Sequence, residues 1–196
     1  HDAMRYSLTK ASMVAARHKV YLCIEPHGVY TKTADGLMKI VNLVRSPWIQ
    51  VNWDTGNAYL AGQEDPYEAM EKVRDRIYHI HAKDISFEQG EAERGTVTGT
   101  PVGCACGEGV VDWERVAKIL EPVDREIFLS VECGTIDEAE RSRAYLEKTL
   151  KGSLLTYCSN CPGRSRLKGA AREVLGGPKP AEVPSHLVLS CLTWPD

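Results

Sequence analysis

The chain has 196 residues, 43% of them hydrophobic and 26% charged, and it carries a formal net charge of −3 at pH 7. This composition is typical of a globular protein with one core, and the slightly acidic balance argues against nucleic acid or an anionic membrane surface as a partner. No apolar run approaches the roughly 18 residues that span a bilayer, and the first residues lack a signal-peptide pattern, so we expect a cytoplasmic protein with small-molecule partners.

Strand and helix patterns alternate along the first 150 residues. Thr33, Asp112 and Thr135 stand where helix N-caps belong, and Pro66 follows the cap Asp65 at a first helical position. We predict helices over residues 3–18, 33–45, 66–76, 112–121 and 135–150, and strands over residues 20–25, 48–53, 78–84 and 127–132. Strands that alternate with helices of this length favour an α/β fold with about four parallel strands.

Three segments depart from this alternation. Gly56, in the run Asp54-Thr55-Gly56-Asn57, predicts a tight turn, and the polar, glycine-rich segment from Ser86 to Gly109 predicts a mobile active-site loop. At residue 151 the composition changes, so we predict a domain over residues 1–150 and an irregular, basic, Gly- and Pro-rich tail over residues 151–196. Within that tail the apolar run 183–192 fits either a strand or a helix.

The run Tyr78-His79-Ile80-His81-Ala82-Lys83-Asp84 combines two histidines, a lysine and an aspartate. Because alternate side chains of a strand share a face, His79, His81 and Lys83 point one way and the apolar residues between them point the other. A polar face of this kind fits a metal site or a proton-transfer site, and it fits an edge strand with a solvated face as well. These residues alone leave both interpretations open.

An acid or an imidazole stands at the carboxyl end of each predicted strand. These residues are Glu25, Asp54, His81 and Glu132. In parallel α/β folds the ligand site lies at this end of the sheet, where three converging carboxylates would repel one another unless a cation neutralised them. We therefore predict one divalent metal ion, and an oxygen-rich set with one imidazole suits Mn²⁺, Mg²⁺, Co²⁺ or Zn²⁺.

The seven cysteines are an odd number and are scattered along the chain, which fits reduced thiols better than a disulfide framework. Two pairs offer a competing metal site, Cys104 with Cys106 and Cys158 with Cys161. A structural zinc site needs a second pair at suitable spacing, so neither pair alone predicts one.

Five segments, in their order and spacing, resemble the sugar phosphate isomerase/epimerase family, whose fold is the xylose-isomerase-like TIM barrel. The segments are Ile24-Glu25-Pro26-His27-Gly28, Val51 to Asn57, His79 to Asp84, Gly107 to Trp113 and Val131-Glu132. The resemblance covers residues 20–150. It implies a partial (β/α) TIM barrel whose strands correspond to the second half of an eight-stranded barrel.

The resemblance also implies roles for individual residues. One divalent metal ion would be bound by Glu25, Asp54, His81 and Glu132. Of these, Glu25 and Glu132 would also be the catalytic acid/base pair, acting on opposite faces of the substrate.

Four further residues would bind substrate: His27, Asn57, His79 and Lys83. Asn57 stands where many relatives have a histidine, and its amide can hydrogen-bond a hydroxyl but cannot titrate. The alternatives are an exposed turn residue for His27 and a hydrogen-bonded strand histidine for His79.

The expected function is that of a metal-dependent isomerase or epimerase that acts on a sugar, sugar phosphate or polyol by proton transfer next to a carbonyl. One alternative is an inosose-type dehydratase of the same family, in which the same metal and base expel a β-hydroxyl. Another is a non-catalytic half-barrel, whose uncovered sheet edges would favour a homo-oligomer. A phosphodiester-cleaving relative is disfavoured because the chain is acidic and has few histidines.

Overall fold

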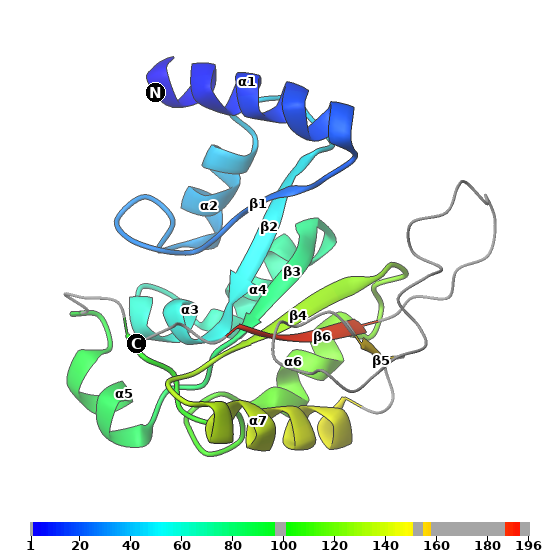
Figure 1. Ribbon diagram of the computed structural model, residues 1–196. Coiled ribbons are helices and arrows are strands. Elements are labelled where there is room, and N and C mark those ends of the chain that lie inside the picture. Colours follow the sequence, from blue (N-terminus) through cyan, green and yellow to red (C-terminus); the bar gives the residue numbers. More distant parts are fainter. Residues whose placement is uncertain (1, 97–100, 151–154, 158–186, 193–196) are drawn as a thin grey trace.

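The computed structural model describes residues 2–96, 101–150, 155–157 and 187–192. A six-stranded sheet with the order β1-β2-β3-β4-β6-β5 lies at the centre of this part of the chain (Figure 1). Its strands are β1 (Leu22–Ile24), β2 (Ile49–Asp54), β3 (Ile77–Ala82), β4 (Ile127–Glu132), β5 (Leu155–Tyr157) and β6 (Leu187–Leu192). Each pair of neighbouring strands is parallel, which confirms the predicted α/β class.

The helices follow the strands in alternation. They are α1 (Asp2–His18), α2 (Ala34–Val41), α3 (Thr55–Ala61), α4 (Pro66–Val73), the 3₁₀ turn η1 (Arg74–Arg76), α5 (Phe87–Glu93), α6 (Trp113–Leu120) and α7 (Ile136–Thr149). Helices α2, α4, α6 and α7 pack against one another in chain order, and the apolar core lies between them and strands β2 to β4 (Figure 1). Within the described ranges, no helix is long and apolar enough to cross a membrane.

Side chains alternate between two faces along β2, β3 and β4. The apolar face is fully or almost fully buried in the core and consists of Val51, Trp53, Ile80, Ala82, Leu129 and Val131. The residues between them are Asn52, Asp54, His79, His81, Ser130 and Glu132. Asp54 pairs with His81 and His81 with Ser130, so the polar residues of adjacent strands lie side by side. Because β3 is a central strand, the edge-strand interpretation of its polar face is wrong.

The predicted turn at Gly56 is wrong, and the predicted loop over residues 86–109 is wrong in part. Asp54 ends β2 and also caps α3, because its Oδ1 accepts a hydrogen bond from the Asn57 amide at 2.8 Å. Gly56 therefore lies in a helix, and a Cβ added to it would lie 2.6 Å from Cγ of Lys83. A glycine is needed here because the Lys83 side chain packs against it, not because the backbone turns. The predicted loop from Ser86 to Gly109 contains α5, and its residues 97–100 lie outside the described ranges.

Most of the predicted tail, residues 151–196, also lies outside the described ranges. Two strands of it are described, and β6 pairs with β4 from Ile127–Leu187 to Glu132–Leu192. The apolar run 183–192, which fitted a strand or a helix, thus contributes a strand beside β4. The domain boundary at residue 151 stays a prediction.

Asp84, two residues after β3, is fully buried and fixes the segment that leads into α6. Its Oδ2 accepts hydrogen bonds from the Gly107 amide at 2.8 Å and from Nε1 of Trp113 at 3.0 Å. Its Oδ1 accepts one from the Val111 amide at 3.0 Å. The Asp84 carboxylate therefore holds the loop to the end of β3.

Replacing Asp84 with alanine should lower the free energy of unfolding by roughly 3 kcal/mol, because three N–H donors, two of them buried, lose their acceptor. Urea denaturation followed by circular dichroism measures this change. The control is Asp75→Ala, since the Asp75 side chain is 88% exposed. Equal stability of the two variants would contradict the anchoring role of Asp84.

Candidate metal centre

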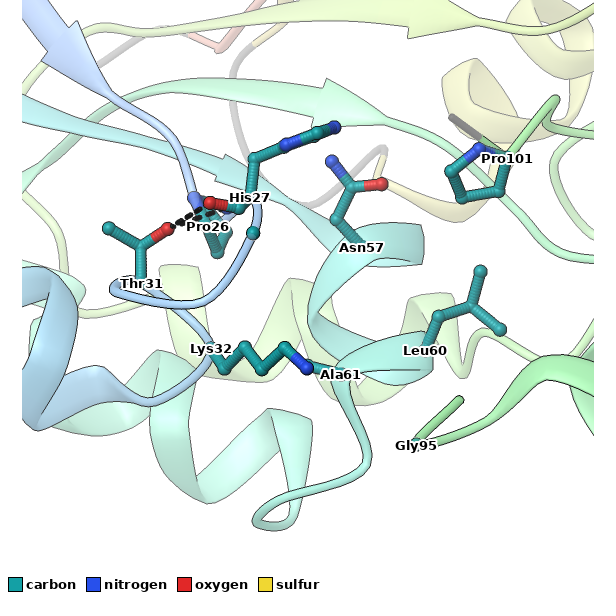
Figure 2. Close-up of a pocket in the computed structure, with 10 residues that line it drawn as sticks. Pro26, His27, Thr31, Lys32, Asn57, Leu60, Ala61, Gly95 and Pro101 are labelled. Carbon is teal, nitrogen blue, oxygen red and sulfur yellow. Dashed lines mark hydrogen bonds between the residues drawn. The ribbon is translucent and has the colours of Figure 1, made fainter. Parts of the chain in front are cut away.

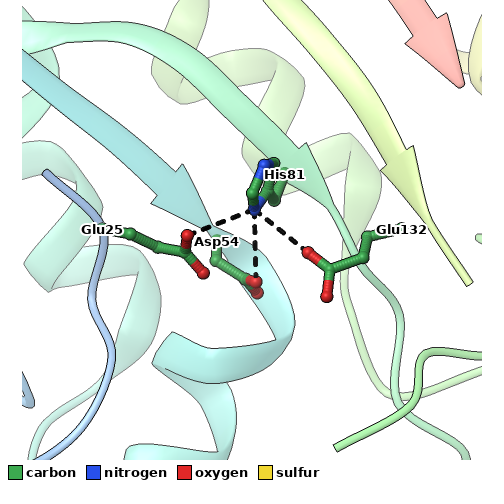
Figure 3. Close-up of side chains that lie close together, drawn as sticks. All are labelled: Glu25, Asp54, His81 and Glu132. Atoms are coloured by element: carbon green, nitrogen blue, oxygen red, sulfur yellow. Dashed lines mark ion pairs between the residues drawn. The ribbon is translucent and has the colours of Figure 1, made fainter. Parts of the chain in front are cut away.

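The four predicted metal ligands meet at the carboxyl ends of four neighbouring strands. Glu25 directly follows β1, Asp54 and Glu132 end β2 and β4, and His81 is the penultimate residue of β3. Each offers one ligand atom, and these atoms all lie within 4.8 Å of one another (Figure 3). The topology therefore brings together residues that are up to about a hundred positions apart in the sequence.

Nδ1 of His81 lies at the centre of the cluster. It is 3.0 Å from Oε2 of Glu132, 3.4 Å from Oε2 of Glu25 and 3.8 Å from Oδ2 of Asp54. Although these oxygens are near, Nδ1 of His81 and Oδ2 of Asp54 are buried atoms without a hydrogen-bond partner among the described residues. Buried polar atoms normally have a hydrogen-bond partner. Nδ1 of His81 and Oδ2 of Asp54 instead lie close to one oxygen each of Glu25 and Glu132, as the ligands of one metal ion would. Three carboxylates and one imidazole suit a hard or borderline divalent cation, so the donor set fits the predicted metal.

Burial and charge act in opposite directions on these groups. Burial works to lower the pKa of His81, but the three neighbouring carboxylates outweigh it and raise that pKa to about 11. Burial works to raise the pKa of Glu132, whereas His81 and Lys83 bring it down to about 2. The pKa of Glu25 is lowered because His81 outweighs burial, and the pKa of Asp54 is raised because burial outweighs His81 and Lys83. Neighbouring positive charge and hydrogen bonds thus decide the direction of the pKa shift for Glu25 and Glu132, whereas burial decides it for Asp54.

Two amides hold Glu25 in place. Nδ2 of Asn57 donates to Oε1 of Glu25 at 2.9 Å, and Nδ2 of Asn52 donates to Oε2 at 3.4 Å. Asn57 was predicted from the sequence as a substrate contact, and it lies close enough to the cluster to orient a ligand too. Asn52 was not predicted, although its place two residues before Asp54 on the same strand puts both side chains on one face.

Lys83 is almost fully buried, and its ammonium lies within the cluster rather than at its rim. Nζ is 2.6 Å from Oε1 of Glu132 and 3.3 Å from Oδ2 of Asp54. It also donates to Oδ1 of Asn57 at 3.3 Å. The predicted substrate contact of Lys83 stays a prediction, and these contacts describe a lysine that already serves two of the carboxylates.

The other two predicted substrate residues, His79 and His27, have different surroundings. His79 is half-buried, with Nε2 2.7 Å from Oγ of Ser130, and burial is the main factor that lowers its pKa to about 4. His27 is exposed and lines a cavity of about 230 Å³ together with Asn57, Lys32 and Leu60 (Figure 2). Because Asn57 also contacts Glu25, the cavity adjoins the metal cluster. Substrate binding by His27 and His79 stays a prediction.

The cysteines provide no comparable site in the described ranges. There, the only group of three or more His, Cys, Asp or Glu side chains placed to hold a metal is the strand-end cluster. Cys106 is buried and its thiol donates to the carbonyl of Ala82, while Cys104 is partly buried. The second candidate pair, Cys158 and Cys161, lies outside the described ranges.

A family model described as "xylose isomerase-like TIM barrel" matches residues 2–149 of the chain. The chain belongs to this family. The resemblance found in the sequence is thereby confirmed, and so is the fold prediction of a partial (β/α) barrel with parallel strands and surrounding helices. The strand-end position of the cluster is the usual place for active sites in such barrels.

Relatives of this xylose isomerase-like chain include proteins with different chemistry. It is 33% identical over 101 residues to 3-oxo-isoapionate decarboxylase of Pectobacterium atrosepticum, covering 52% of this chain and 35% of that protein. It is 27% identical over 157 residues to an inosose dehydratase of Clostridium perfringens, covering 72% and 52%. A crystal structure of a D-tagatose 3-epimerase-like protein matches with a TM-score of 0.62 at 25% identity, covering 75% and 53%. The chain thus spans about half the length, or less, of these relatives.

Replacing His81 with alanine should weaken Mn²⁺ binding by more than about 100-fold, because it removes a ligand rather than a supporting contact. Isothermal titration of the metal-free protein with Mn²⁺ measures the affinity. The matched control is His18→Ala, because His18 is exposed at the end of α1. Wild-type affinity in the His81 variant would contradict the ligand assignment.

Proposed function

We propose that this chain contributes the metal centre of a divalent-metal-dependent enzyme that isomerises or epimerises a sugar, sugar phosphate or polyol by proton transfer next to a carbonyl. The observation that carries the proposal is the pair Glu25 and Glu132. They approach His81 from opposite sides within a cluster whose donor atoms fit a divalent cation (Figure 3). Two carboxylates on opposite sides of one position can take a proton from one face of a substrate and return a proton to the other.

The bound cation would supply Lewis-acid polarisation of a carbonyl and its neighbouring hydroxyl, which acidifies the C–H bond between them. Side chains of the protein would carry out the proton transfers. Glu25 is held by two neutral amides and Glu132 by an ammonium, so the positions of both carboxylates are fixed. One carboxylate removes the proton and the other delivers one.

The cavity beside the cluster is suited to a polar substrate. His27 and Asn57 face it with hydrogen-bonding groups, and Lys32 lines it with a partly buried side chain (Figure 2). Lys32 makes no ion pair with any residue in the described ranges. An ammonium that has no carboxylate partner and lies in a substrate cavity favours a phosphorylated ketose over a neutral one.

Replacing Lys32 with methionine should raise KM for a phosphorylated ketose about tenfold and leave KM for the free ketose unchanged, since about 1.4 kcal/mol of charge-assisted hydrogen bonding is lost. Steady-state kinetics with both sugars measure the difference. Lys39→Met is the control because Lys39 is exposed on α2. An equal effect on both sugars would contradict phosphate recognition by Lys32.

Dehydration is the second candidate, and a specific comparison favours it. The 27% identity to an inosose dehydratase extends over 157 residues, and the same base and metal could expel a hydroxyl after proton abstraction. An isomerase or epimerase returns a proton instead, so its product keeps the composition of the substrate, with one carbon-bound hydrogen replaced by a hydrogen from the solvent.

Incubation of the Mn²⁺-loaded protein with ketoses and inososes in deuterium oxide separates these functions. For an isomerase or epimerase we expect one deuterium incorporated next to the carbonyl without loss of water, detected by NMR and mass spectrometry, and abolished by a chelator. A product lighter by one water molecule would support the dehydratase. Neither exchange nor dehydration would contradict both.

The match covers only 52% of that inosose dehydratase. Catalysis by a complete barrel is therefore proposed for this chain by analogy with its longer relatives. The remaining alternative is a non-catalytic half-barrel. Among the strands that the structure describes, β1 has only one neighbour, so association of copies through this edge is the corresponding expectation. Light scattering of the purified chain tests it, and a monomer would count against it.

A further inference from the structure

A space for the Lys83 side chain is built into the fold. Its stem passes two glycines: a Cβ on Gly56 would lie 2.6 Å from Cγ of Lys83, and a Cβ on Gly103 would lie 3.0 Å from the same atom. The hydroxyl of Thr55 donates to the carbonyl of Lys83 at 2.6 Å and so ties the start of α3 to the end of β3. With 1% of its side chain exposed, Lys83 is directed inward by elements on both sides.

The Lys83 ammonium contacts two carboxylates of the cluster directly and is linked to the third through Asn57. It contacts Glu132 at 2.6 Å and Asp54 at 3.3 Å directly. It also donates to Oδ1 of Asn57, whose Nδ2 donates to Glu25 at 2.9 Å. One buried cation therefore connects every acidic ligand.

The contacts divide the oxygens of Glu132 between two partners. Lys83 contacts Oε1, which leaves Oε2 facing Nδ1 of His81 at 3.0 Å. A carboxylate fixed at one oxygen presents the other in a defined direction, which is how a supporting contact orients a metal ligand.

Charge adds a second reason for a lysine at this position. Three ionised carboxylates around one divalent cation leave a formal charge of −1, and one buried ammonium cancels it. Without that ammonium, the excess negative charge would lie in a largely buried site, where it is costly.

We propose that Lys83 is a positioning residue of the metal centre: it orients Glu132 and Asp54 and balances the charge of the three carboxylates, and it does not bind substrate. This inference rests on the proposed metal-dependent function. It replaces the sequence-based expectation that Lys83 holds a substrate oxygen.

The test is Lys83→Met, which keeps the unbranched stem and removes the ammonium. Isothermal titration with Mn²⁺ alone should show binding at least about tenfold weaker than in the wild type, which is the usual effect of losing a residue that supports a ligand. Circular dichroism checks that the variant is folded, and Lys39→Met is the exposed control. An unchanged Mn²⁺ affinity together with a raised KM would assign Lys83 to the substrate and overturn the inference.

A second variant covers the case in which Lys83→Met does not fold. Adding Glu132→Gln removes one negative charge, so the double variant should regain the folded circular dichroism spectrum if charge balance is the role of the lysine. If the double variant also fails to fold, loss of charge balance does not explain the instability, and the inference is wrong. A wild-type chain that binds no Mn²⁺ would overturn the proposed function itself, whereas unchanged affinity in Lys83→Met overturns only the role of Lys83.

Discussion

Mutual repulsion of three carboxylates at adjoining strand ends is the constraint on which the rest of this structure depends. Glu25, Asp54 and Glu132 converge in a largely buried place, where like charges destabilise the folded state unless positive charge or hydrogen-bond donors compensate. The protein supplies His81 at the centre and the buried ammonium of Lys83 behind it. Under the proposed function, a divalent cation would complete this compensation and would link folding of the site to its chemistry.

Strand pairing and the segments that directly follow the strands hold these groups in position. Parallel pairing aligns Asp54 with His81, and the start of α3 directly after β2 lets Asp54 serve as helix cap and as candidate ligand. Small residues leave room for the buried lysine, and the carboxylate of Asp84 holds the following loop to β3. The apolar face of the same strands packs against the helices, so the core that stabilises the domain also fixes the spacing of the site.

The sequence predicts the features that depend on local interactions. β4 has the predicted bounds 127–132, and Thr33, Asp112 and Thr135 cap helices as predicted, because a cap bonds to an amide only a few residues away. The convergence of the four candidate ligands followed from parallel topology, since each ends a strand or lies beside its end. These are properties of short segments and of their order.

Features that depend on distant partners could not be predicted. Helix α3 is short and begins inside a run typical of a turn, and Gly56 is there because Lys83, far away in sequence, packs against it. A lysine or aspartate next to a strand usually lies in solvent, so the burial of Lys83 and Asp84 becomes visible only with their partners in place.

The central claim is that one divalent metal ion is bound by carboxylates and an imidazole at the strand ends. X-ray absorption spectroscopy of the protein loaded with one equivalent of Co²⁺ tests it most directly. The account predicts a first shell of oxygen and nitrogen only, with the outer-shell scattering of an imidazole. A sulfur shell, which would assign the metal to the cysteines, or the absence of bound Co²⁺ would contradict it.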